Sequence, residues 1–303
     1  MTDTNIWLPQ GLPCACALRA KPFLPTQWRE CEVQHRVLLL NLMPQKEVTE
    51  TDIARTLAAC GMDVQVLLMK IAGQTYKTTP AEHMQKFYLD FEEYQPFRFD
   101  HLIITGAPLE QIPFEQVRYW DQLCAIMDWA ETHVAHTLYI CWGAQAGLYK
   151  HYGIPKYALP EKMFGVFSQQ VLGVSSPLMG GLSPSFVMPN SRHTEVREAD
   201  IAEHVADGLH IIASSSESGV GVVATTDLRK VFIVGHLEYE PFTLHNEYHR
   251  DLAKKLPIQP PVHYYRPDGT IDFSWHKDAV QFYSNWLRLD EKNDESWCSK
   301  ISL

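Results

Sequence analysis

A cysteine at the junction of an apolar run and several small residues is the first candidate for chemistry in this chain. The β-prone run 138–140 leads directly into Cys141, and Gly143 and Ala144 follow closely. Small residues allow a turn too tight for larger side chains, so this pattern predicts a strand, a sharp turn and a helix start. A cysteine at such a turn would face the first helical amides, including Trp142 N–H, which stabilise an oxyanion. The same helix end would favour the thiolate form of Cys141 over its thiol form. Free cysteines are more often buried core residues than catalytic ones. A catalytic role for Cys141 therefore requires a base elsewhere in the chain.

A histidine and a glutamate after a second apolar run can supply that base. The run 231–235 leads into His236-Leu237-Glu238. Side chains at i and i+2 of an extended segment point the same way, so Glu238 could orient the imidazole while His236 faces a nucleophile. A single H-x-E motif is as often a surface pair. Two strand-end motifs together favour a Cys-His-Glu triad.

Strand-like and helix-like segments alternate between residues 36 and 150. We expect strands at 36–42, 62–71, 101–105 and 137–140, a helix with a start signal at Thr49 and Asp52, one with a capping box at 79–82, and one over 117–127. Continuous apolar strands between helices predict an α/β fold, a doubly wound, mostly parallel sheet with helices on both faces. Loops at the carboxyl ends of such strands meet, so residues 106–108 should lie beside the Cys141 turn.

The remaining segments are expected to complete the same domain. Short strand-like runs at 164–172, 210–214 and 220–225 predict a mixed edge of the sheet, and helices follow at 243–254 and near the C-terminus. Residues 1–35 show no clear periodicity. We therefore expect an irregular arm over 1–35 and a single domain over 36–303.

Composition excludes several classes of function. The chain has 303 residues, of which 46% are hydrophobic and 20% charged, as in ordinary globular enzymes. A net charge of −10 disfavours nucleic acid as a partner. No apolar run approaches the roughly 20 residues of a membrane span, and no secretory signal is visible, so we expect no membrane partner and a cytoplasmic location. The seven cysteines lack metal-ligand spacing, so no metal site is expected.

Several long runs resemble a known family. They are NLMPQKEVTETD, TTPAEHMQKFY, IITGAPLEQIPFEQVRYW, ICWGAQAGLYKHYGIPK, EKMFGVF, SRHTEV and GHLEY. These runs are similar to the homoserine O-acyltransferases, the succinyl- or acetyl-transferring first enzymes of methionine biosynthesis. That family is similar in fold to class I glutamine amidotransferases. The resemblance covers residues 36–290.

The resemblance implies roles for particular residues. Cys141 would be the acyl-accepting nucleophile, His236 the proton acceptor and Glu238 its orienting partner. We expect Trp142 N–H and the amide of Ala107 to stabilise the oxyanion. The other implied site residues are Lys162, Ser191 and Arg250 as substrate contacts, Lys46 as a further site residue, and Glu110 as an influence on the acyl donor.

Some positions depart from the family pattern. Leu237 stands where proline is usual between histidine and glutamate, Asn190 where a histidine precedes Ser-Arg, and His276 where an arginine follows tryptophan. These departures bear on the acceptor amino acid more than on the chemistry, so serine stays open as an alternative to homoserine.

The sequence therefore predicts an O-acetyltransferase that moves acetyl from acetyl-CoA to the hydroxyl of L-homoserine through an acyl-cysteine. Acetyl-CoA would be a co-substrate, no bound cofactor is expected, and a homodimer is compatible with the sequence. Acetyl is preferred because succinyl-using members carry glycine at position 110, where Glu110 would fill space and repel the succinyl carboxylate. The alternatives are succinyl-CoA as the donor, a glutamine amidotransferase-type hydrolase, and a non-catalytic binding protein.

Overall fold

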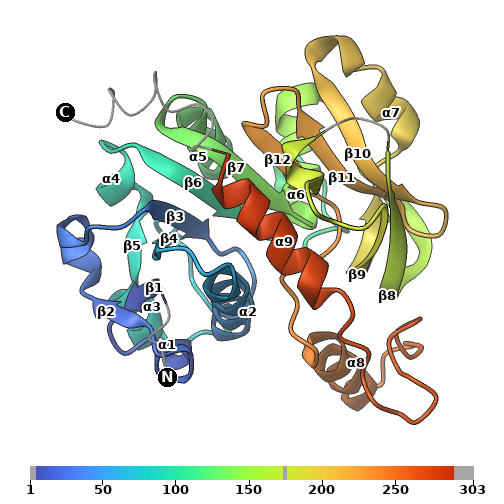
Figure 1. Ribbon diagram of the computed structural model, residues 1–303, viewed down its shortest axis with the longest axis horizontal. Coiled ribbons are helices and arrows are strands. Elements are labelled where there is room, and N and C mark those ends of the chain that lie inside the picture. Colours follow the sequence, from blue (N-terminus) through green and yellow to red (C-terminus); the bar gives the residue numbers. More distant parts are fainter. Residues whose placement is uncertain (1–4, 173–175, 290–303) are drawn as a thin grey trace.

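A single sheet crosses the molecule (Figure 1). The structure, a computed structural model, describes residues 5–172 and 176–289. Within these residues the sheet has 12 strands in the order β2-β1-β4-β3-β6-β7-β12-β11-β10-β8-β9, with β5 paired to β4. The strands are β1 (Ile6–Pro9), β2 (Lys21–Phe23), β3 (His35–Leu40), β4 (Val64–Lys70), β5 (Tyr88–Asp90), β6 (Phe99–Ile104), β7 (Val134–Ile140), β8 (Tyr157–Val171), β9 (Ser185–Glu195), β10 (Leu209–Ser215), β11 (Gly219–Thr225) and β12 (Lys230–Ile233).

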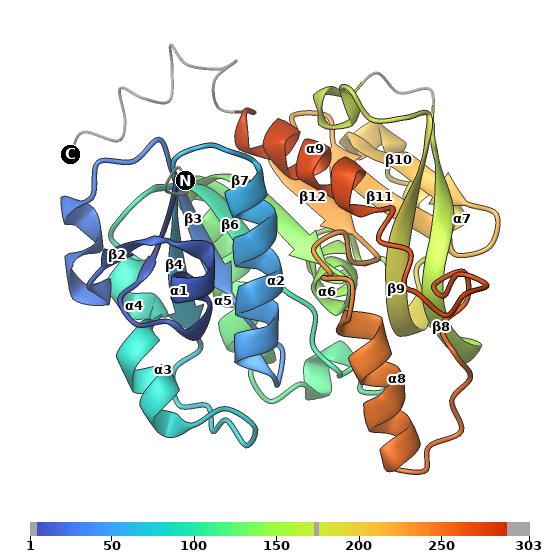
Figure 2. The same ribbon diagram turned by 60° about the horizontal axis from the view of Figure 1, so that its bottom comes forward.

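Helices cover both faces of the sheet (Figure 2). They are α1 (Pro13–Leu18), α2 (Lys46–Ala59), α3 (Ala81–Phe87), α4 (Phe91–Tyr94), α5 (Trp120–His133), α6 (Trp142–Tyr152), α7 (Glu198–Ala202), α8 (Thr243–Ala253) and α9 (His276–Leu287). Short 3₁₀ helices lie at Pro25–Glu30, Phe114–Gln116, Pro177–Met179 and Val205–Asp207. In the part of the chain described here, no helix combines the length and apolar character needed to cross a bilayer.

Burial on both faces explains why the central strands are continuously apolar. Successive side chains of a strand point to opposite faces. In β3, Val37 and Leu39 pack into the core beneath α2 and α9, whereas Leu38 and Leu40 pack into the core beneath α5 and α6. Strands β4, β3, β6, β7 and β12 pair in parallel. The predicted α/β fold with helices on both faces is confirmed.

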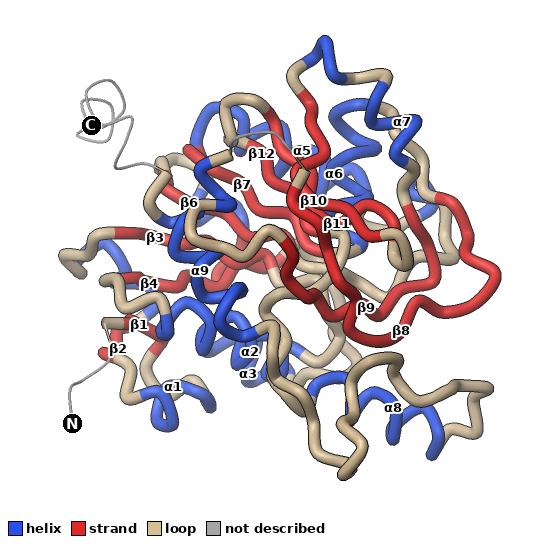
Figure 3. The backbone as a smooth tube through the Cα atoms, turned by 45° about the vertical axis from the view of Figure 1, so that its right-hand side comes forward, coloured by secondary structure: helices blue, strands red, loops and turns tan. Residues whose placement is uncertain are grey.

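The other side of the sheet is antiparallel, as the mixed-edge prediction requires. Strands β12, β11, β10, β8 and β9 pair antiparallel in that order. Figure 3 shows β8 and β9 at this end of the sheet, with α8 close to them. A third small core lies here and brings the region around α8 against β8; its buried members are Phe164, Val166, Tyr239, Leu244, Tyr264 and Trp275.

Residues 1–35 differ from the irregular arm that we expected. Strand β1 pairs in parallel with both β2 and β4, so the described part of this segment extends the sheet. Ile6 and Leu8 of β1 and Leu12 before α1 are buried in the main core. The prediction was wrong because elements of three to six residues are too short to show a clear period.

Two predicted helix starts also need correction. Helix α2 begins at Lys46, three residues before Thr49. Helix α3 follows Pro80 without a side-chain cap, so no capping box forms. The hydroxyl of Thr79 instead donates to the carbonyl oxygen of Pro44 at 3.1 Å, which connects this segment to the loop before α2.

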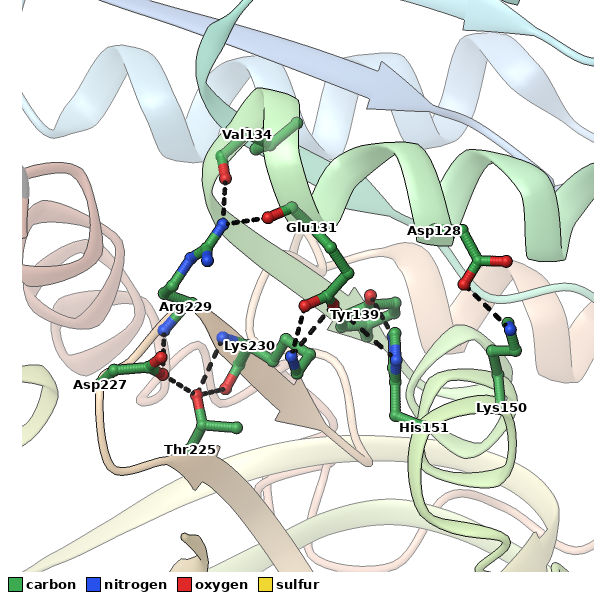
Figure 4. A network of polar contacts seen from close by, with 10 residues as sticks. All are labelled: Asp128, Glu131, Val134, Tyr139, Lys150, His151, Thr225, Asp227, Arg229 and Lys230. Carbon is green, nitrogen blue, oxygen red and sulfur yellow. Dashed lines mark hydrogen bonds and ion pairs between the residues drawn. The ribbon is translucent and has the colours of Figure 1, made fainter. Parts of the chain in front are cut away.

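A polar network connects α5, α6 and β12 (Figure 4). The Glu131 carboxylate accepts hydrogen bonds from Lys230 Nζ at 3.0 Å on each oxygen, and the Glu131 carbonyl accepts one from Arg229 at 2.7 Å. Lys150 on α6 pairs with Asp128 on α5 at 2.9 Å. These contacts fix α6, whose first turn carries Trp142, relative to the strand that precedes His236.

Candidate active site

Cys141 lies at the sharp turn between β7 and α6. Its backbone has φ 53° and ψ −116°, a conformation that is uncommon for a residue with a side chain. Its N–H donates to the carbonyl of Ile233 in β12 at 2.7 Å, and its carbonyl accepts from Gln145 N–H at 3.1 Å. The turn is therefore fixed both by the neighbouring strand and by the helix that follows.

The loop after β6 packs directly against this turn. A Cβ on Gly143 would lie 2.6 Å from the carbonyl oxygen of Thr105, and one on Gly106 would lie 3.3 Å from the Cβ of Cys141 and 3.6 Å from Trp142 N. Only glycine allows the backbones to come this close. Trp142 is the first residue of α6, and buried Ala107 follows Gly106, so both expected oxyanion residues belong to backbone that borders the nucleophile.

His236 follows the strand adjacent to the nucleophile. β12 pairs in parallel with β7, so that Ile233 lies opposite Ile140. Nδ1 of His236 lies 2.7 Å from a carboxylate oxygen of Glu238. Residues 237–238 form a turn and not the extended segment that we assumed, so the contact is present but has a different backbone origin. The ring of Tyr239 stacks on the imidazole with centroids 4.0 Å apart.

The charges around His236 favour its protonated form. Burial alone would lower its pKa, but the negative charges of Cys141 and Glu238, with hydrogen bonds to both, raise the pKa of His236 well above its usual range. All three side chains are buried, with exposed fractions of 5% or less. The arrangement can therefore hold a thiolate–imidazolium pair away from water.

Arg192, which the sequence analysis did not identify, is buried close to this pair. Its guanidinium donates to neutral oxygens, those of Asn190 at 3.2 Å and Thr194 at 2.7 Å. Burial lowers the pKa of Arg192, and the negative charge of Cys141 opposes that shift. The guanidinium thus adds positive potential at the nucleophile. Arg192 lies in the family-like run SRHTEV, but nothing local to that run shows that its side chain is buried near Cys141.

Three of the predicted substrate residues meet at one carboxylate, that of Glu247 in α8. Its Oε1 accepts hydrogen bonds from Lys162 at 2.8 Å, Ser191 at 2.8 Å and Arg250 at 3.3 Å. Sequence reasoning missed Glu247, although its i, i+3 spacing to Arg250 on one helix was a usable signal. The ring of Tyr239, which stacks on His236, is close enough to this carboxylate to be affected by its charge. Burial and the charges of Glu247 and Glu238 together raise the pKa of Tyr239.

Lys46 lies apart from this cluster. It opens α2 beside a cavity of about 320 Å³ lined by residues from 41–46 and 71–78. Its Nζ donates to the carbonyl oxygen of Asn41 at the end of β3. Burial lowers the pKa of Lys46 to about 8, although the negative charge of Glu50 opposes this shift.

Glu110 lies in the loop after β6 and borders a second cavity, of about 370 Å³, which Phe114, Lys156 and Thr194 also line. The hydroxyl of Thr194 donates to the side chain of Gln145 at 2.8 Å. Gln145 is in the first turn of α6, the helix that begins after Cys141.

The fold is similar to that of solved glutamine amidotransferases. One is a glutamine amidotransferase from Thermotoga maritima, with a TM-score of 0.54 and 14% identity, covering 87% of this chain and 100% of that one. Another is a glutamine amidotransferase from Methylobacillus flagellatus, with a TM-score of 0.53 and 13% identity, covering 84% of this chain and 94% of that one. At such identities the likeness shows the fold alone.

Similarity in sequence is more specific. Homoserine O-acetyltransferase from Bacteroides fragilis is 49% identical over 255 residues, 83% of each chain. Homoserine O-acetyltransferase from Geobacillus kaustophilus is 48% identical over 254 residues, again 83% of each chain. A family model described as homoserine O-succinyltransferase matches residues 6–294. The chain therefore belongs to the homoserine O-succinyltransferase family and is an acyltransferase.

Proposed function

We propose that the protein transfers acetyl from acetyl-CoA to the hydroxyl of L-homoserine through a thioester on Cys141. The observation that carries this proposal is the buried Cys141-His236-Glu238 arrangement at the ends of adjacent strands. The names of the similar acetyltransferases from Bacteroides and Geobacillus support the acceptor and the acyl donor. Acylated homoserine would serve methionine biosynthesis, and we place the reaction in the cytoplasm.

In the first half-reaction the Cys141 thiolate attacks the carbonyl carbon of acetyl-CoA. A carbon–sulfur bond forms, and the oxyanion accepts hydrogen bonds from Trp142 N–H and the amide of Ala107. When the tetrahedral species collapses, the bond to the CoA sulfur breaks and the leaving thiolate takes the proton of His236. The products are acetyl-Cys141, neutral His236 and CoA. Exchange of one thioester for another is nearly isoenergetic, which suits a cysteine nucleophile.

In the second half-reaction neutral His236 accepts the proton of the homoserine hydroxyl while its oxygen attacks the acetyl-cysteine. The carbon–oxygen bond forms, the bond to Cys141 breaks, and the thiolate–imidazolium pair is restored. Glu238 orients the imidazole in both steps.

The cluster around Glu247 has the charges needed to bind an amino acid. The guanidinium of Arg250, which donates to Asp251 at 2.7 Å and to Glu247 at 3.3 Å, is the group suited to the carboxylate of the acceptor. The carboxylate of Glu247 suits the ammonium group. Lys162 and Ser191 would complete this acceptor site.

Acylation of Cys141 is the direct test of this chemistry. Intact mass after exposure to acetyl-CoA without an acceptor should show one added acetyl group in the wild type and none in Cys141→Ala. A protein that turns over without ever carrying an acyl group would refute the acyl-cysteine route.

A substrate panel tests the two specificities. Crossing acetyl-CoA and succinyl-CoA with homoserine and serine should give the highest kcat/KM for acetyl-CoA with homoserine. Because one methylene is worth only about 1–3 kcal/mol in a pocket, serine is the acceptor to compare. Glu110→Gly should shift the preference towards succinyl-CoA. Hydrolysis of glutamine in place of acyl transfer would favour the activity named for the structural neighbours.

A further inference from the structure

The cavity beside Glu110 contains a second charged residue, Lys156. This lysine lies just before β8 and is half-buried. Its Nζ donates to the carbonyl oxygen of Ile112 at 2.6 Å and lies 3.4 Å from that of Leu109, so it contacts the loop on both sides of Glu110. The ammonium also lies over the ring of Phe114, 4.1 Å from its centroid. These contacts place a cation at the wall of the cavity.

Lys156 and Glu110 interact electrostatically. Burial lowers the pKa of Lys156, while the negative charges of Glu110 and Glu115 partly oppose that shift. Two of the three N–H donors of the ammonium reach neutral carbonyl oxygens. A cation whose direct partners are neutral keeps most of its attraction for any anion that enters the same cavity.

Two residues of the cavity lining, Glu110 and Thr194, are connected to segments that contact the Cys141 turn. Glu110 lies in the loop that includes Gly106, which packs against the Cys141 turn. Thr194 has a hydroxyl that bonds to Gln145 one turn along the helix that begins after Cys141. Two short segments therefore connect the lining of the cavity to the Cys141 turn.

We propose that Lys156 is a specificity-determining residue of the acyl-donor pocket, the cation that binds the terminal carboxylate of a dicarboxylic acyl-CoA whenever Glu110 does not occupy the site. This inference rests on the proposed function and extends it. With Glu110 present, the glutamate offsets the ammonium and fills the space, so a short uncharged acyl group is preferred. With Glu110 removed, the ammonium is available to the succinyl carboxylate.

The test compares acyl donors in single and double variants. For Glu110→Gly, the ratio of kcat/KM for succinyl-CoA to that for acetyl-CoA should rise. In Glu110→Gly/Lys156→Met this ratio should fall back by about tenfold or more, because the incoming carboxylate loses its counter-charge. Glu110→Gly/Lys156→Arg, which keeps the cation, should retain the raised ratio.

The ratio separates specificity from a merely structural role. If Lys156 only stabilised the loop, Lys156→Met would lower kcat/KM for both donors together and leave the ratio unchanged. Turnover of acetyl-CoA by each preparation reports whether the variant is folded. Lys150→Met in the Glu110→Gly background is the matched control, because Lys150 pairs with Asp128 outside the cavity, and its ratio should not change.

Two results would overturn the inference, and they are distinguishable. A raised ratio in Glu110→Gly that persists in the Lys156→Met double variant would refute the role of Lys156 alone. An unchanged ratio in Glu110→Gly would refute the role proposed for Glu110 and, with it, that of Lys156.

Discussion

Two neighbours, Cys141 and Glu238, favour the protonated form of the His236 imidazole. Because the Glu238 charge helps to raise the pKa of His236, Glu238→Gln should lower that pKa. The thiolate–imidazolium pair would then lose its proton at lower pH, so the alkaline limb of kcat/KM should move to lower pH while some activity remains. Measured pH profiles check this shift, and an alkaline limb that stays in place in Glu238→Gln would contradict the electrostatic role.

His236→Ala should lower turnover by roughly 10²–10⁴-fold, which steady-state kinetics measures.

Lys46 provides a pH-dependent prediction about stability. Its pKa is about 8 in the fold, against 10.5 as the ordinary value, because burial disfavours the charge. Between these values the unfolded chain binds the proton and the folded chain does not, so stability should rise with pH over this window. Relative to Lys46→Met, the wild type should gain on the order of 3 kcal/mol in the free energy of unfolding between about pH 8 and pH 10.5. Urea titrations across this range measure the gain. A difference that stays constant with pH would show that Lys46 titrates normally.

The sequence pointed to the proposed triad because Cys141 and His236 each follow an apolar strand, and Cys141 also precedes small residues. Those signals are local, so one chain suffices to read them. Glu247 follows no apolar strand, and its i, i+3 spacing to Arg250 is the one local signal it carries. Its importance arises only when Lys162 in β8, Ser191 in β9 and Arg250 in α8 converge on it, and that convergence depends on tertiary packing.

The β7–α6 turn depends on a close approach between two backbones. A methyl group on Gly143 would lie 2.6 Å from the carbonyl oxygen of Thr105, and neither backbone can move without shifting Cys141. Gly143→Ala should therefore destabilise the fold by about 2 kcal/mol or more and lower kcat further than stability alone explains. Thermal unfolding and kinetics measure the two effects.

Gly61→Ala is the matched control. Gly61 has φ +72° but nothing within 4 Å of the added carbon, so alanine there should cost only about 1 kcal/mol from backbone strain and leave kcat unchanged. Similar losses of activity in both variants would contradict the steric account of the turn.

Elements were predictable from the sequence where burial on both faces gave long apolar runs, as in β3, β4, β6 and β7. Short elements were not, because β1, β2 and α1 contain too few residues for a period to emerge. The capping box before α3 failed for another reason. Thr79 bonds to the distant carbonyl of Pro44, a tertiary partner that no local motif specifies.

At the scale of the whole molecule, the N-terminal segment belongs to the folded body, and matched leucines can show this. Leu8 in β1 is 1% exposed, whereas Leu24 is 47% exposed. Leu8→Ala should lower the free energy of unfolding by about 2–4 kcal/mol, and Leu24→Ala should change it by less than about 0.5 kcal/mol. Denaturant titrations give both values. Equal and small effects would mean that residues before β3 do not share the cooperative unfolding of the sheet.

The sheet places the proposed triad at the ends of central strands and the proposed substrate contacts on other segments. Cys141 and His236 follow the adjacent central strands β7 and β12, whereas the proposed acceptor cluster comes from β8, β9 and α8, and the proposed acyl-donor cavity from the loops after β6 and α6 together with Thr194 of β9. On the proposed assignments, a substitution at Glu110 would act on the acyl group and one at Arg250 on the amino acid, while the bond-making atoms of Cys141 and His236 keep their positions.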